Sequence, residues 1–171
     1  MRVFELDMVS SFDLFVVTMS SISTTNTELR REYRILNHEI NLRVISSDTE
    51  GRFAIIEMLL PGHAPGAPPH FHSLMTERFI VLEGELEVFT GGEWKTLQAG
   101  DSEVARPKAV HGFRNSSDAN TRILLVATPG GHELFFAELM EWMEREPVWP
   151  PADLGALVEF GKRHDTQYVS G

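Results

Sequence analysis

The chain has 171 residues, a length that suits one domain with its own hydrophobic core. Hydrophobic residues make up 42% of it and charged residues 23%, and it holds no cysteine, which excludes disulfides, thiolate metal ligands and thiol nucleophiles. The formal net charge of −10 would repel a phosphate backbone, and no cluster of lysine and arginine offsets it, so nucleic acid is not expected as a partner.

Residues 1–38 are expected to form an N-terminal strand or a poorly ordered arm. Its apolar run, Leu14 to Val17, is too short to span a membrane, and no membrane partner is expected. The run also lacks the positive flank of a secretory signal, because its neighbours are acidic: Glu5, Asp7 and Asp13. The expected location is therefore the cytoplasm. Either Met1 or Met19 could be the natural start.

Residues 39–129 alternate between short β-branched or aromatic runs and turn signals, the pattern of an all-β barrel or sandwich. The expected strands are Ile40–Ile45, Arg52–Leu60, two within Phe79–Phe89, Val110–Arg114 and Thr121–Ala127. Turns are expected at Asp48–Gly51, Glu83–Glu85, Gly91–Gly92, Gly100–Asp101 and Asn115–Asn120. The stretch from Pro61 to Pro69 contains four prolines and two glycines, and it is expected to be an irregular loop.

Residues 130–171 are expected to be a helical C-terminal extension. Apolar residues recur at helical spacing within His132–Arg145 and within Asp153–Lys162, and the proline-rich break Pro147–Pro151 separates the two segments. Both short helices are expected to pack on the outside of the barrel. Their aromatic and methionine side chains are interpreted as core residues and not as a cofactor site.

Four residues are candidates for a metal site. His70 and His72 would point to the same face of an extended strand, so both imidazoles can reach one point. Glu77 follows at an odd offset, so a turn or bulge over Ser73–Thr76 is expected to return its carboxylate to that face. His111 would come from a later strand lying alongside. Three imidazoles and one carboxylate suit one divalent transition metal (Fe, Mn, Ni, Co, Cu or Zn) and leave positions open for a substrate.

At these residues the sequence resembles the cupin superfamily. The first cupin motif, G-x5-H-x-H-x3-4-E-x6-G, is matched from His70 to Gly84, although its leading glycine is displaced. The resemblance covers about residues 40 to 128. It implies a double-stranded β-helix, the jelly-roll barrel of cupins, with the metal ligands named above.

The second cupin motif, G-x5-P-x-G-x2-H-x3-N, is matched at Gly100, His111 and Asn115. Arg106 stands at the proline position with Pro107 one place late, and Lys108 stands at the position of a glycine. These departures affect the local turn and leave the ligand His111 in register.

The segment Thr128–Phe136 is similar to the one that follows the barrel in small bacterial cupins related to flavonol (quercetin) 2,3-dioxygenases. The resemblance therefore implies a metal-dependent oxygenase that acts on a small aromatic or enolic molecule. Glu77 would serve as a ligand or as the catalytic general base. Small cupins commonly dimerise through N-terminal strands, so a homodimer is expected, with Phe12–Val17 as the exchanged strand.

Other functions stay open. The same ligands could serve a hydrolase, isomerase or cyclase, the barrel could bind or sense a small molecule without turning it over, or the metal could be purely structural. Three residues lie at an even offset from a ligand on the same strand, so their side chains should share its inward face: Phe79, Val81 and Phe113. They are expected to line the substrate pocket or to be ordinary core residues. His63 and Arg106 could support the ligands or the entrance, or be ordinary loop residues. His38, His132 and His164 are assigned no role.

Overall fold

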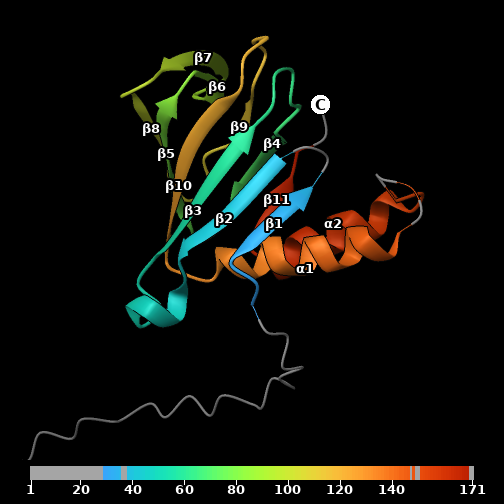
Figure 1. The fold of residues 1–171 in the computed structure, drawn as a ribbon. Helices are drawn as coiled ribbons and strands as arrows, with labels where there is room; N and C mark the ends of the chain where they lie inside the picture. The colour runs from blue at the N-terminus through green and yellow to red at the C-terminus, as the bar shows by residue number, and fades with distance from the viewer. Residues whose placement is uncertain (1–28, 36–37, 147, 149–150, 170–171) are drawn as a thin grey trace, which may run out of the picture.

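Residues 29–35, 38–146, 148 and 151–169 are described in the computed structural model, and they form two antiparallel sheets that face each other (Figure 1). The expected strand Phe12–Val17 lies outside these residues, so the exchanged strand and the homodimer stay predictions. Neither described helix is long and apolar enough to cross a membrane.

The two sheets are assembled from strands that are distant in sequence. The six-stranded sheet runs β1 (Glu32–Ile35), β2 (His38–Val44), β3 (Ala54–Leu60), β10 (Thr121–Thr128), β5 (Thr76–Glu83) and β8 (Ser102–Ala105). The five-stranded sheet runs β11 (Thr166–Tyr168), β4 (Ala67–His72), β9 (His111–Arg114), β6 (Glu85–Thr90) and β7 (Glu93–Gln98). This arrangement is consistent with the predicted double-stranded β-helix.

The core lies between the sheets because the strands alternate between buried and more exposed side chains. In β10 every second residue from Thr121 to Ala127 is buried, and β5 buries Glu77 and its i+2 and i+4 neighbours in the same way. Successive side chains of a strand point to opposite faces, so one face of each strand contributes to the core. The fully buried apolar side chains include Ile56, Met58, Phe79, Leu86, Val88, Ile123 and Leu125.

The region from Pro61 to Pro69 differs from the prediction, because β4 begins at Ala67 and includes Pro68 and Pro69. Proline cannot donate to a strand ladder, so it is found at strand starts, edges and irregularities. The register between β4 and β9 shifts between Ala67 and His70, which places both prolines in the irregular part of the pairing. The predicted loop is therefore shorter than expected, and it ends just before the ligand strand.

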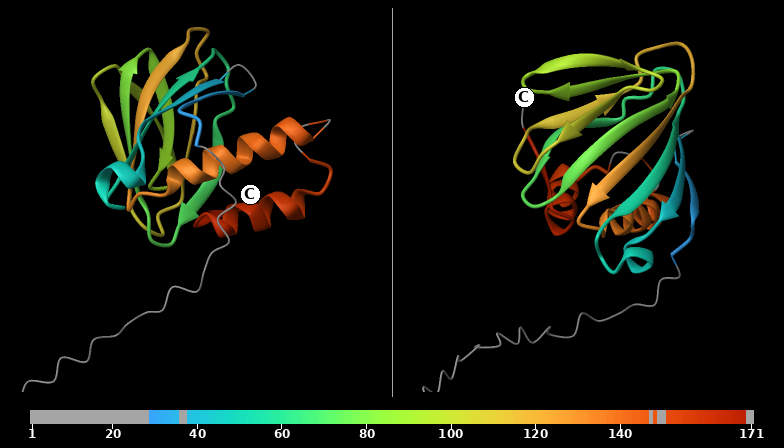
Figure 2. Two further views of the ribbon diagram at one scale, coloured as in Figure 1. Left: turned by 60° about the horizontal axis from the view of Figure 1, so that its bottom comes forward. Right: turned by 90° about the vertical axis from the view of Figure 1, so that its left-hand side faces the viewer.

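The two predicted helices are present, and they lie side by side at one end of the barrel (Figures 1 and 2). Helix α1 is His132–Arg145, and α2 is Leu154–Arg163, whose N-cap Asp153 accepts hydrogen bonds from the amides of Gly155 and Ala156. The short 3₁₀ helix η1 (Ser46–Thr49) forms the turn between β2 and β3. The strand β11, which follows α2, was not predicted.

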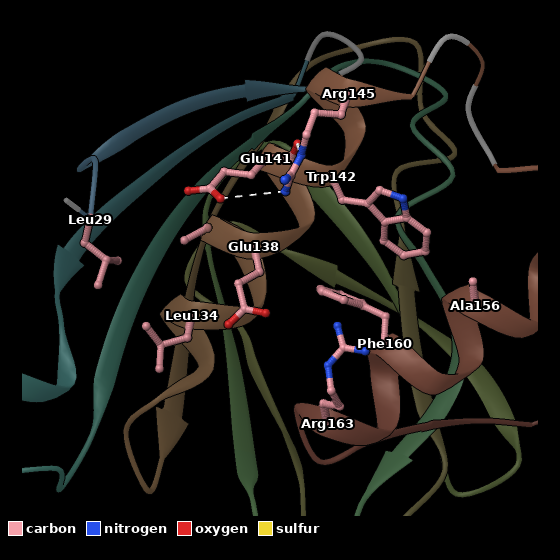
Figure 3. A pocket seen from close by; sticks show the side chains of 10 residues that line it. Leu29, Leu134, Glu138, Glu141, Trp142, Arg145, Ala156, Phe160 and Arg163 are labelled. Atoms are coloured by element: carbon pink, nitrogen blue, oxygen red, sulfur yellow. Dashed lines mark hydrogen bonds and ion pairs between the residues drawn. The ribbon is translucent and has the colours of Figure 1, made fainter. Parts of the chain in front are cut away.

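A pocket of about 660 Å³ lies between α1 and α2 (Figure 3). Its walls combine the rings of Trp142 and Phe160 with the charged side chains of Glu138 and Arg163. None of the four predicted metal ligands lines it, so this pocket is a feature of the helical pair and not of the barrel interior.

Gly66 gives a test of how tightly the approach to β4 is packed. Its φ is +60°, and a Cβ added there would lie 2.0 Å from the carbonyl oxygen of Phe113. Gly66→Ala should lower the free energy of unfolding by about 2–5 kcal/mol, the sum of left-handed strain and overpacking. Urea unfolding measures this change.

The matched control is Gly91→Ala, because Gly91 also has a positive φ (+64°) but no atom within 4 Å of the added Cβ. This variant should lose only the strain, about 1–2 kcal/mol. Equal losses in the two variants would show that the backbone moves freely at Gly66.

Candidate metal centre

The side chains of His70, His72, Glu77 and His111 meet inside the barrel. One donor atom from each residue can be chosen so that all four lie within 4.8 Å of one another. All four side chains are buried, with at most 5% of the residue surface exposed. These are the four residues predicted from the sequence, and the structure brings them together.

Two neighbouring strands and one opposing strand place the cluster. β4 and β9 pair side by side with His70 opposite His111, and His72 shares the inward face of β4. Glu77 lies on β5, which belongs to the other sheet. The odd offset between His72 and Glu77 therefore reflects a crossing from one sheet to the other over residues 73–75, and not a bulge within one strand.

Each histidine of the cluster is oriented by a backbone carbonyl. A carbonyl oxygen only accepts, so Nδ1 must carry the proton, and the neutral ring then presents the lone pair of Nε2. This arrangement orients metal-binding histidines in proteins. The Nδ1–oxygen distances are 2.7 Å for His70 with Pro68, 2.8 Å for His72 with Asp165 and 2.9 Å for His111 with Ala109.

The carboxylate of Glu77 lies among imidazoles. Its Oε2 is 3.0 Å from Nε2 of His111, and its Oε1 is 3.4 Å from Nε2 of His72 and 3.1 Å from Nε2 of His132. Burial acts to raise the pKa of Glu77, but the close contacts with His111, His132 and His72 outweigh it and hold the pKa well below its usual value. Glu77 is therefore a carboxylate anion.

The two histidines of β4 differ in their electrostatics. Burial, with a contribution from His111, lowers the pKa of His70 to about 4, so this ring is neutral near pH 7. Burial also acts to lower the pKa of His72, but the nearby negative charge of Glu77 outweighs it and raises the pKa. The cluster thus attracts positive charge.

The donors fit a metal ion. Three Nε2 lone pairs and an anionic carboxylate face one another, an arrangement that is repulsive unless a cation lies among them. Within the part of the chain that the structure describes, the buried Nε2 of His72 has no hydrogen-bond partner, although Glu77 is near it. Nitrogen and oxygen donors without sulfur suit a first-row transition metal. The structure therefore supports the predicted site.

His132 was assigned no role from the sequence, and the structure corrects that interpretation. It is the first residue of α1, it is 8% exposed, and its Nε2 contacts Glu77 at 3.1 Å. The only sequence signal was the glycine pair Gly130–Gly131, which lets the chain turn directly from β10 into α1. β10 pairs with β5, so this turn lies near Glu77.

Asp165 also contributes to the site and was missed. Its backbone carbonyl accepts from His72, and its carboxylate accepts from the amides of the β4–β5 connection: Ser73 (2.8 Å), Leu74 (2.9 Å) and Met75 (3.1 Å). Burial acts to raise the pKa of Asp165, but these amides and the charge of His72 outweigh it and lower the pKa. β11 follows at once and pairs with β4, with Thr166 opposite His72.

The three predicted pocket residues point inward as expected. Phe79, Val81 and Phe113 are buried in the core cluster, with 0%, 1% and 8% of their surfaces exposed. The ring of Phe79 lies 6.2 Å from that of His111 and 5.5 Å from that of Phe113. Phe79 thus lies beside a ligand ring, and the contact of all three residues with a substrate stays a prediction.

The two loop candidates lie on the surface. Nε2 of His63 is 2.8 Å from Oδ1 of Asp118, and the His63 side chain is 68% exposed. Arg106 is exposed as well. Lys108, which stands where the cupin motif has glycine, has φ +68° and donates its amide to the carbonyl of His72 at 2.6 Å. The positive φ explains why glycine suits this position, and lysine adopts it here.

A jelly-roll barrel with an internal cluster of three histidines and one glutamate defines a class of metal-binding β-barrel proteins. Residues 56–127 match the family model of the cupin domain, so the chain contains a cupin domain. The resemblance found in the sequence is confirmed.

Two curated relatives are dioxygenases by name. The chain is 35% identical over 94 residues to gentisate 1,2 dioxygenase 1 of Aquipseudomonas alcaligenes, covering 55% of this chain and 26% of that protein. It is 30% identical over 108 residues to quercetin 2,3-dioxygenase of Bacillus subtilis, covering 62% of this chain and 32% of that protein. The chain thus spans about a quarter to a third of the length of these relatives.

Solved structures support the fold. A predicted oxalate decarboxylase from Thermotoga maritima superposes with a TM-score of 0.54 and 19% sequence identity. The match covers 59% of this chain and 97% of that one. At this identity the similarity concerns the barrel alone.

Metal addition should stabilise the protein. A metal ion that binds the folded state alone, present at 100 times its Kd, adds about 2.7 kcal/mol to the free energy of unfolding. Thermal unfolding with and without Co²⁺ measures the effect. The stabilisation should disappear in His111→Ala, and its persistence there would place the metal elsewhere.

Asp165→Ala should weaken metal binding about 10-fold, because it releases the connection that carries His72 toward Glu77. Isothermal titration with Co²⁺ measures the Kd. The control is Asp153→Ala, which removes the N-cap of α2 and should cost about 1 kcal/mol of stability with an unchanged Kd. An equal loss of affinity in both variants would mean that general destabilisation explains the effect.

Proposed function

We propose that this protein is a metal-dependent dioxygenase of a small hydroxylated aromatic or enolic molecule. One divalent transition metal would be held by His70, His72, Glu77 and His111. The observation that carries the proposal is the convergence of four buried donors, with each imidazole oriented by a backbone carbonyl. A bound transition metal would supply a Lewis acid and redox chemistry with dioxygen.

The names of the curated relatives support the choice of reaction. Both are dioxygenases, and gentisate and quercetin are both hydroxylated aromatic molecules. The donor set supports it as well, because four protein ligands leave positions of a five- or six-coordinate ion for other molecules. A closed structural site would have no such position.

Glu77 is the proposed base. A hydroxylated substrate must lose a proton to become an electron-rich enolate, and Glu77 is a buried carboxylate anion within the cluster. A positioned carboxylate can accept such a proton. In the overall reaction both atoms of one dioxygen molecule enter the substrate and a carbon–carbon bond breaks. The substrate supplies the electrons, so no separate reductant is consumed.

The test is oxygen-dependent turnover. Protein loaded in turn with Fe²⁺, Mn²⁺, Ni²⁺, Co²⁺ or Cu²⁺ is mixed with gentisate, quercetin or a 1,3-diketone, and oxygen uptake is followed with an electrode. One molecule of oxygen should be consumed per substrate, and ¹⁸O₂ should place two heavy atoms in the products taken together. Glu77→Gln should lower kcat/KM by about 10²–10⁴-fold.

Glu83→Gln is the matched control, because Glu83 ends the same strand with its side chain 69% exposed. Its kcat/KM should equal that of the wild type. Equal loss of substrate without oxygen would contradict the dioxygenase and favour an isomerase, cyclase or hydrolase. A ligand that is bound and returned unchanged with every metal would favour a binding or sensing protein.

A further inference from the structure

A fourth histidine, His132, reaches the cluster from outside the two sheets. It begins α1, and its Nε2 lies 3.1 Å from Oε1 of Glu77. The opposite carboxylate oxygen, Oε2, lies 3.0 Å from Nε2 of His111. Glu77 is therefore contacted at Oε2 by His111 and at Oε1 by His132 of the C-terminal extension, with the ligand His72 farther from Oε1 at 3.4 Å.

The backbone at His132 is anchored by its neighbour Glu133. This carboxylate is 1% exposed, and it accepts hydrogen bonds from the amide of Ser46 at 2.7 Å, from the Ser46 hydroxyl and from the amide of Gly131 at 2.9 Å. A buried carboxylate that accepts hydrogen bonds from three donors has its hydrogen-bonding needs met, and removing any of these donors would cost free energy. The start of α1 is thus joined to η1, on the six-stranded side of the barrel.

Packing fixes the ring of His132 as well. It stacks on Phe135 with centroids 5.3 Å apart and an interplanar angle of 16°, and Phe136 meets it edge-on at 5.1 Å. The preceding turn packs closely on η1, because a Cβ added to Gly130 would lie 2.7 Å from that of Ser46. The ring is therefore held in one place against Glu77.

The hydrogen-bond pattern separates His132 from the three ligand histidines. His72 and His111 also contact Glu77 through Nε2, but a backbone carbonyl holds the proton of each ring on Nδ1. No carbonyl does so for His132 within the described residues, and a carboxylate only accepts hydrogen bonds, so the contact of His132 with Glu77 is made with the proton on Nε2. Its Nδ1 is buried and has no hydrogen-bond partner within the described residues. In a neutral ring protonated at Nε2, this atom carries a lone pair and has no proton to donate. The ligand histidines have the opposite tautomer, with the proton on Nδ1. His132 is thus a donor to Glu77, whereas the others present lone pairs.

We propose that His132 is a positioning residue that holds the Glu77 carboxylate in the orientation that binds the metal. This inference rests on the metal site of the proposed function. His132 donates to Oε1 and limits rotation of the carboxylate, so Oε2 stays directed at His111. The C-terminal extension thereby becomes part of the metal centre, through a residue that is not itself a ligand.

The test compares Co²⁺ binding by His132→Phe and His132→Gln. Phenylalanine keeps the stacking on Phe135 but removes the donor, so the Kd should rise about 10-fold or more. Glutamine can donate from its amide and should restore affinity to within about 3-fold of the wild type. The control is His164→Phe, because His164 lies in the same aromatic cluster but contacts Glu138. Its Kd should not change.

Counting bound imidazoles distinguishes a positioning residue from a ligand. Pulsed electron paramagnetic resonance of the Cu²⁺-loaded protein should report the same number of coordinated imidazoles in the wild type and in His132→Gln. The loss of one imidazole would overturn the proposal in favour of a ligand role. An unchanged Co²⁺ affinity in a folded His132→Phe would overturn it as well.

A metal-free measurement separates this proposal from the proposed function. Thermal unfolding of the apoprotein is compared for the wild type, His132→Phe, Glu77→Gln and the double variant. Coupled residues give shifts in Tm that are not additive. Non-additive Tm shifts in a protein that does not bind Co²⁺ would support the contact between His132 and Glu77 and contradict the metal-dependent function. Additive Tm shifts would contradict the contact itself.

Discussion

The centre of this protein depends on three hydrogen bonds between an imidazole Nδ1 and a backbone carbonyl. Each bond fixes the tautomer and the orientation of one ring, so that three Nε2 lone pairs are left available in the cluster that also contains Glu77. Burial removes the water that would otherwise separate these groups. The nitrogen and carboxylate donors therefore repel one another, and a bound cation would relieve this repulsion. The cluster is for this reason a candidate metal site.

The carbonyls that orient the rings come from separated parts of the chain. Those of Pro68 and Ala109 lie two residues before His70 and His111, so they are local consequences of the two ligand strands. The one that orients His72 belongs to Asp165, 93 residues away. The site therefore combines a barrel that carries the ligands with a C-terminal segment whose carbonyl orients one of them.

Much of the centre could be predicted, because it depends on local rules. The period of two along a strand places His70 and His72 on one face, and the same rule gives Phe79 and Val81 the parity of Glu77. The cupin motif then relates His111 to them. The odd offset of Glu77 was explained by a turn or a bulge over Ser73–Thr76, and the structure has a turn there, in which the chain passes from one sheet to the other.

The residues that were missed have no local pattern. A single histidine at a helix start, such as His132, cannot be told from a surface residue without its neighbours in space. β11 has three residues and pairs with β4 across more than 90 positions, so neither periodicity nor spacing predicts it. Pro68 and Pro69 argue against a strand by their chemistry, and only the irregular pairing of β4 accommodates them.

The place of β11 has a consequence for the order of events when the protein is made. Strands β2 to β10 leave the ribosome before Asp165 does. The ligands can therefore be brought together before the Asp165 carbonyl is available to orient the ring of His72. Closing a contact over 93 residues is slow compared with pairing neighbouring strands. The carbonyl that orients His72 is therefore made only after all the strands that carry the four ligands.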